Sequence, residues 1–210
     1  MEEWDDLPHV NTHSSPRWFD PEALRPLHNL NHRLFEVVID EWRRGPAPPD
    51  IATLGAKLAR LDDGLLWRLA RVPVCWIDAE FSREEGWTET DASTGTVPTL
   101  PDCPLPRARA LELAGVTFAL AAATAKESRE TACIMFGMRP KVADSFARFS
   151  VETLHRLGQT HAHWVRPRWY ETPQDWDRMI ATAEHADVAR LPPVSLRVLN
   201  RMLADLEPAT

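Results

Sequence analysis

A short pair of helices predicted over Lys141–Gly158 carries the side chains best placed to do chemistry, and that chemistry would be DNA recognition. In a helix-turn-helix the second helix enters the major groove, where its outward side chains contact base edges. We expect this role for Glu152, His155, Arg156 and Gln159. Neighbouring cations would neutralise phosphates, and these are Lys141, Arg148, Arg166 and Arg168. The sequence leaves open the alternative that the two helices only close a core and carry solvated charges outside.

Tryptophans suggest a second kind of chemistry, which is protein recognition. The chain has nine of them, and tryptophan is favoured at the energetic centres of protein interfaces. Three lie in polar segments without helical patterning, and we expect them to contact a partner chain: Trp4, Trp18 and Trp87. The open alternative is that each packs on its own domain.

Motifs for catalysis, cofactors and metals are missing from the sequence. It has no glycine-rich phosphate loop, no Gly-x-Ser-x-Gly elbow and no His-Glu-x-x-His pair. His161 and His163 alternate on a predicted extended segment, but no third ligand stands at a telling spacing. The cysteines at 75, 103 and 133 form no Cys-x-x-Cys pair. We therefore predict a protein that is not an enzyme, with no catalytic residues, no metal site and no cofactor.

Charge is unevenly distributed along the chain. Residues 1–105 hold 10 Lys and Arg against 19 Asp and Glu, and residues 106–210 hold 14 against 12, which gives −9 and +2 and sums to the net charge of −7. A DNA-binding protein usually shows a basic face, so DNA contact is expected only in the second part. The sequence shows no basic leader and no long uncharged apolar run, which predicts a cytoplasmic protein without membrane contact.

The predicted elements of the chain are mostly helices. Residues 1–20 are expected to form an irregular arm, and the Ser-, Thr- and Pro-rich residues 82–105 a linker. Apolar residues at helical spacing, with glycine, proline and capping signals, predict the other elements. Between the arm and the linker these are helices over Leu27–Arg44, Ile51–Leu61 and Leu65–Arg71 and an extended segment over Val74–Phe81. After the linker they are helices over Arg107–Ile134, Lys141–Arg148, Val151–Gly158, Pro173–Glu184 and Val194–Leu206, with an extended segment over His163–Trp169.

An internal repeat relates the two parts at an offset of 88 residues. Leu58–Phe81 aligns without gaps with Phe146–Trp169, and six of the 24 positions are identical. The order of elements is also parallel on both sides, although two unrelated helical hairpins could reach this similarity by chance. The favoured prediction is a mainly α fold of two helical repeats, over residues 21–81 and 106–210, packed as a pseudo-two-fold pair. Each repeat is expected to have a helix-turn-helix-like hairpin and a short extended segment, and the extended segments could pair with each other or with another subunit.

The second repeat resembles FlhD, the D subunit of the flagellar master activator FlhDC. The similarity is strongest over residues 118–169 and rests on the order of several features. A long Ala-rich helix ends at Gly137 with Met138 after it, and a short helix follows with Ala143 and Phe146. The remaining features are Ser150 before an apolar-x-x-Leu-x-x-Leu pattern, Thr160, and the basic-aromatic pair Arg168-Trp169.

The resemblance implies a helical transcription factor with a helix-turn-helix-like hairpin. Such a protein works as a dimer and joins an FlhC-like subunit to bind promoter DNA and recruit RNA polymerase in flagellum biogenesis. This chain departs from the family because it is about twice the usual length, with a degenerate copy in an acidic front part. One chain could thus replace a dimer, although a homodimer of the whole chain also remains possible.

Two functions compete at this point. The first is an FlhD-like transcriptional regulator that acts with a partner subunit on promoter DNA. The alternative is a protein of the same fold that binds no DNA, either an adaptor or an anti-regulator. Four arginines discriminate between the two functions: Arg148, Arg156, Arg166 and Arg168. If they converge on one exposed face, the DNA-binding regulator is favoured. If they are dispersed or paired with carboxylates, the protein that binds no DNA is favoured.

Overall fold

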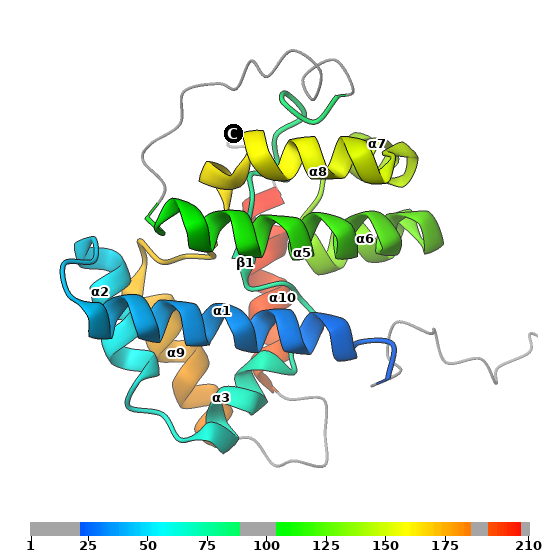
Figure 1. The fold of residues 1–210 in the computed structure, drawn as a ribbon. Helices are drawn as coiled ribbons and strands as arrows, with labels where there is room; N and C mark the ends of the chain where they lie inside the picture. Colours follow the sequence, from blue (N-terminus) through cyan, green and yellow to red (C-terminus); the bar gives the residue numbers. More distant parts are fainter. Residues whose placement is uncertain (1–21, 89–103, 186–192, 207–210) are drawn as a thin grey trace, which may run out of the picture.

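Helices account for most of the protein in the computed structural model, which describes residues 22–88, 104–185 and 193–206 (Figure 1). The predicted mainly α class is confirmed. The elements before residue 89 are α1 (Arg25–Arg44), α2 (Pro49–Leu58), α3 (Asp63–Ala70) and the short strand β1 (Ile77–Asp78). Those after residue 103 are α5 (Arg107–Glu127), α6 (Arg129–Phe136), α7 (Pro140–Arg148), α8 (Val151–Thr160), the 3-10 turn η2 (Ala162–Trp164), β2 (Arg166–Pro167), α9 (Pro173–Glu184) and α10 (Pro193–Leu206).

Local signals in the sequence explain where several helices begin and end. The Asp62 side chain accepts a hydrogen bond from the Leu65 N–H at 2.8 Å and caps α3. Ser150 caps α8, accepting from the Thr153 N–H at 3.0 Å. Each satisfies a backbone donor that the first helical turn leaves free. Gly137 ends α6 in the left-handed conformation, with φ 63°, which glycine adopts without steric cost.

One predicted helix differs from the structure. The helix expected over Arg107–Ile134 is broken at Ser128, which is extended (φ −157°, ψ 116°) and restarts the chain as the N-cap of α6. The two extended segments are short and pair with each other: β1 and β2 have two residues each, and η2 occupies part of the second segment. Before α9 the Thr172 hydroxyl donates to the Trp169 carbonyl at 3.1 Å and makes no cap hydrogen bond.

Two long helices form the middle of the molecule. Figure 1 shows α1 and α5 side by side, with α7 and α8 beyond α5, and with α2, α3 and α9 around α1. The buried apolar residues from Leu24 to Met202 form one continuous core. By length and composition α5 could cross a membrane, with a mean hydropathy of 1.3 over its most apolar window. However, 44% of that window is buried, and the core helix of a soluble protein passes the same test.

The strands β1 and β2 pair antiparallel where the front and rear parts of the chain meet. Ile77 pairs with Pro167, and Asp78 pairs with Arg166. Two residues after each strand the chain adopts a positive φ at a residue other than glycine, 59° at Glu80 and 53° at Trp169. Such residues are uncommon because the left-handed region is sterically unfavourable for side chains. The two strands therefore end in the same unusual way.

Beyond the strands, each part of the chain supplies a tryptophan to the core of the other. Trp87 follows β1 but packs against Phe146 of α7 and Trp164 of η2, with ring centroids 5.2 and 5.1 Å apart. Trp176 of α9 stacks on Trp76 at 4.6 Å and meets Phe35 of α1 edge-on at 6.0 Å. Because large aromatic side chains dominate core energetics, this exchange joins the two parts tightly.

Candidate functional site

The outer face of α8 brings together the four side chains expected to read DNA bases. Thr153, Leu157 and Gly158 are the buried residues of α8, and α8 packs against α5. The opposite side of the helix is exposed, because residues three or four apart share one face. We call the exposed residues of this helix the α8 face: Val151, Glu152, His155, Arg156 and Gln159. Val151 is 83% exposed, which is unusual for an apolar side chain beside polar neighbours.

The α8 face is suited to hydrogen bonding and to one apolar contact, but it carries little net charge. Arg156 and Glu152 offset one another, and the exposed Arg148 of α7 adds one positive charge. DNA-binding proteins commonly place several Lys and Arg side chains against phosphates. The α8 face by itself offers only one such cation.

Arg166 and Arg168 were expected to contact phosphates, and this expectation is corrected because both are paired with carboxylates of the same chain. The Arg166 guanidinium lies 3.2 Å from an Asp78 carboxylate oxygen and also contacts Glu80. Arg168 is 7% exposed and lies 3.7 Å from the other Asp78 oxygen. Neither arginine lies on the α8 face. We call these four residues the strand cluster.

Backbone carbonyls complete the surroundings of Arg168. Its Nε donates to the Cys75 carbonyl at 2.8 Å, and an Nη group donates to the Phe136 carbonyl that ends α6. A buried guanidinium needs such partners because an unpaired buried charge is costly. Arg168 therefore holds β1, β2 and the end of α6 together, which is a structural role.

The ionisation of Arg166 is consistent with this role. Burial by itself would lower the pKa of the Arg166 guanidinium, but the negative charges of Asp78 and Glu80 outweigh burial, and the pKa is raised. The guanidinium thus remains positive in a half-buried position. Its charge is balanced within the protein and is not offered to a ligand.

Lys141 lies at the start of α7 and is highly exposed. Its ammonium group lies 2.9 Å from a Glu84 carboxylate oxygen, and this hydrogen bond raises the pKa of Lys141. An exposed pair of this kind contributes little to stability and opens readily. Lys141 could therefore reach a ligand, but the neighbouring Glu84 carboxylate offsets its positive charge.

The three tryptophans expected to contact a partner differ in outcome. Trp87 is only 1% exposed, and its indole N–H donates to the Glu80 carbonyl at 3.2 Å. The backbone at Gly86, with φ 92°, passes so near the Trp164 ring that a Cβ there would collide with it. Trp87 therefore packs on its own chain, and its assignment as a partner contact is wrong. Trp4 and Trp18 lie outside the described residues.

The two histidines of the second predicted extended segment do not share a face. His161 is buried at the end of α8 and stacks on Trp87, with ring centroids 5.0 Å apart. His163 lies in η2 and is partly exposed. Within the described ranges, no three His, Cys, Asp or Glu side chains are grouped so that they could hold a metal ion.

Sequence reasoning did not identify Asp78 and Glu80 as the partners of Arg166 and Arg168 in the strand cluster. They counted toward the net negative charge of residues 1–105. A signal was present in the repeat, because the offset of 88 aligns Asp78 with Arg166 and Glu80 with Arg168.

Comparison with known proteins gives no match. No family model, no curated protein and no solved structure matches the chain.

Proposed function

We propose that this protein is an interaction module that binds another protein through the α8 face and does not bind DNA. The observation that carries the proposal is the strand cluster. Two of the four arginines that would have to converge on DNA, Arg166 and Arg168, are instead paired with Asp78 and Glu80 at the two strands. The two that remain exposed are Arg148 and Arg156. The overall charge of −7 also disfavours binding to a polyanion.

The composition of the α8 face suits a protein partner. Val151 offers an exposed apolar contact at the start of α8, and Glu152, His155, Arg156 and Gln159 extend the face along the helix with hydrogen-bonding groups of both charges. Interfaces commonly combine an apolar centre with a polar rim. An adaptor or anti-regulator of transcription would use such a face to bind a regulatory protein.

An FlhD-like regulator of promoter DNA is the second candidate. It is favoured by the exposure of all four expected base-reading side chains on one helix, and by Arg148 at the end of the helix before it. In that case an FlhC-like subunit would have to supply most of the phosphate contacts, because the chain itself presents few.

A gel-shift assay at low salt with the full chain and duplex DNA tests the choice. We expect no retention of DNA. Retention that is lost in the double variant Arg148→Glu with Arg156→Glu would overturn the proposal. A pull-down from the native host provides the positive arm: a protein captured by the wild type should be lost with Val151→Asp. It should be kept with Val116→Asp, a matched change at a valine of α5 that is 53% exposed.

We further propose that the fold is one helical unit built twice, so that a single chain stands in for a dimer. Two pairs of residues 88 positions apart in the chain support this duplication. The caps Asp62 and Ser150 share the same backbone angles, φ −73° and ψ 162°. Asp78 also pairs with Arg166 across the strands. When two equivalent strands pair antiparallel about a two-fold axis, the residue on the axis faces its own equivalent in the other strand. Asp78 and Arg166 are equivalent at the offset of 88, and they face each other.

Opposite charges on the proposed axis would favour pairing within one chain. If two identical front parts paired, Asp78 would face a second Asp78, and two rear parts would bring arginines together. Like charges directly opposite each other destabilise a strand pair. The pair Asp78 and Arg166 thus favours the front part meeting the rear part.

A further inference from the structure

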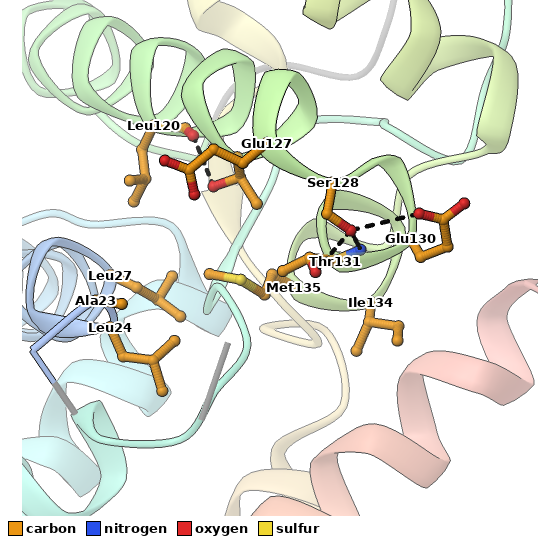
Figure 2. Close-up of a pocket in the computed structure, with 11 residues that line it drawn as sticks. Ala23, Leu24, Leu27, Leu120, Glu127, Ser128, Glu130, Thr131, Ile134 and Met135 are labelled. Atoms are coloured by element: carbon orange, nitrogen blue, oxygen red, sulfur yellow. Dashed lines mark hydrogen bonds between the residues drawn. The ribbon is translucent and has the colours of Figure 1, made fainter. Parts of the chain in front are cut away.

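A pocket lies where the start of α1 meets the junction of α5 and α6 (Figure 2). It has a volume of about 740 Å³. Figure 2 shows Leu24 and Leu27 below Leu120 of α5, with Met135 beside them and Ile134 beyond Met135. Ile134 is 40% exposed, although most large apolar residues of the described chain are buried. These apolar side chains form an open floor, and polar residues border it: Thr124, Glu127, Ser128, Glu130 and Thr131.

A second pocket lies at the other end of the same helix pair. Arg33 of α1 contacts Glu112 of α5 at 2.7 Å, and Asp40 contacts Arg109 at 3.6 Å, so the two helices run antiparallel. At the end of α1 the second pocket is smaller, about 280 Å³. Its walls are Glu41, Arg44 and residues 45–48 on one side and Pro104, Leu105 and Pro106 on the other.

The residues that lead into α5 are thus packed against the end of α1. Leu105, two positions before α5 begins, is only 3% exposed. In the proposed repeat, residues 45–47, which line the second pocket, are equivalent to residues 133–135 of α6 at the offset of 88. Of these, Ile134 and Met135 line the large pocket. The same offset relates residues 104–106 to Pro16, Arg17 and Trp18.

We infer that the large pocket is the docking site for the chain's own segment around Trp18. The described chain begins at Glu22, and its second residue, Ala23, already lines the pocket. An extended chain spans about 3.3 Å per residue, so residues 16–19 are within reach of the floor. Trp18 and Phe19 supply aromatic side chains for the apolar floor. Arg17 is the only Lys or Arg in residues 1–21, and it meets Glu130 at the polar border.

This inference draws on the proposed duplication but does not depend on the choice between protein and DNA as partner. It gives Trp18 a place within the molecule, as the structure already does for Trp87. The duplication is tested by exchanging the charges of Asp78 and Arg166, and neither residue lines the pocket. The duplication and the docking of the segment around Trp18 can therefore fail separately.

Limited trypsin digestion of the full chain tests the docking. Arg17 is the first trypsin site, and the next, Arg25, precedes Pro26 and resists cleavage. Loss of residues 1–17, followed by mass spectrometry, therefore reports on this segment alone. We expect Ile134→Asp to accelerate cleavage after Arg17 by about tenfold, because cleavage follows the population of the open form. The matched control Val151→Asp, at an exposed valine of α8, should leave the rate unchanged.

The same measurement contains the results that would overturn the inference. Equal cleavage rates in the wild type, Ile134→Asp and Phe19→Ser would show that the pocket does not hold the segment. Phe19→Ser leaves the pocket itself intact and so guards against a folding defect of Ile134→Asp. Protection that disappears on dilution would assign the pocket to a second copy of the chain and would equally overturn docking within one molecule.

Discussion

Two pairs of arginines, close in sequence and expected to contribute to one DNA interface, end in opposite environments. Arg148 and Arg156 are exposed around α8, whereas Arg166 and Arg168 are paired with Asp78 and Glu80 at the meeting point of the two strands. The difference lies in what packs against each segment. An arginine's sequence neighbours therefore do not reveal whether its charge serves a ligand or the fold.

The energetic consequences of the two environments differ. Removing one partner of a buried ion pair leaves an uncompensated charge and costs about 3–5 kcal/mol, whereas an exposed pair contributes about 0–1 kcal/mol. The side chains of Asp78 and Arg166 keep 23% and 22% exposure, so the lower end of the first range applies.

The largest effect is expected from charge reversal in the strand cluster. Asp78→Arg places a third positive charge beside Arg166 and Arg168 and should lower the free energy of unfolding by about 3 kcal/mol, measured by urea denaturation. The exchange Asp78→Arg with Arg166→Asp should restore much of that loss, because it returns opposite charges to the strand pair. A double variant no more stable than Asp78→Arg would contradict the proposed pairing on the axis.

Removing the guanidinium of Arg168 should have the next largest effect. In Arg168→Met the carbonyls of Cys75 and Phe136 lose their donor, and we expect a loss of about 2 kcal/mol. Arg148→Met serves as the matched control at an exposed site and should change stability by less than about 0.5 kcal/mol. Similar losses in both variants would remove the distinction between the two pairs of arginines.

The exposed ion pair at the start of α7 should contribute little. Glu84→Ala leaves Lys141 without its carboxylate, and the free energy of unfolding should fall by no more than about 0.5 kcal/mol. Thermal melts at low and high salt provide the check, since salt should abolish even this difference. A large loss would mean that exposure does not separate the two environments.

His28 provides a third and smaller case, in which a partly buried group has no opposite charge. Burial, and then the nearby Arg71, lower its pKa below the ordinary 6.5. Among the described residues its Nε2 finds no hydrogen-bond partner. The unfolded chain therefore binds the proton more tightly than the folded one, and stability should fall as the pH drops below about 6.5. It should level off below the folded pKa.

Urea midpoints at pH 7.5 and 5.5 test this effect. The difference between the two midpoints should shrink in His28→Gln, which cannot be protonated. The matched variant His155→Gln, on the exposed α8 face, should retain the wild-type difference. An unchanged difference in His28→Gln would show that protonation of His28 is not coupled to folding.

Local features of the chain were predictable where they depend on neighbouring residues. The apolar spacing of α1 and the capping hydroxyl of Ser150 act within one or two helical turns. The break at Ser128 escaped prediction because the alanines on both sides also favour a continuous helix. The expected base-reading side chains were found exposed because they lie opposite the buried positions of α8.

The sequence by itself determined the helical class, most helix positions and the outward side of α8, because these follow from spacing and capping over a few residues. Only the tertiary structure decided that Trp87 is buried and that Arg166 and Arg168 meet Asp78 and Glu80. These contacts join segments up to 90 residues apart in the chain. Packing across such a separation sets which charges lose their water, and no local pattern encodes it.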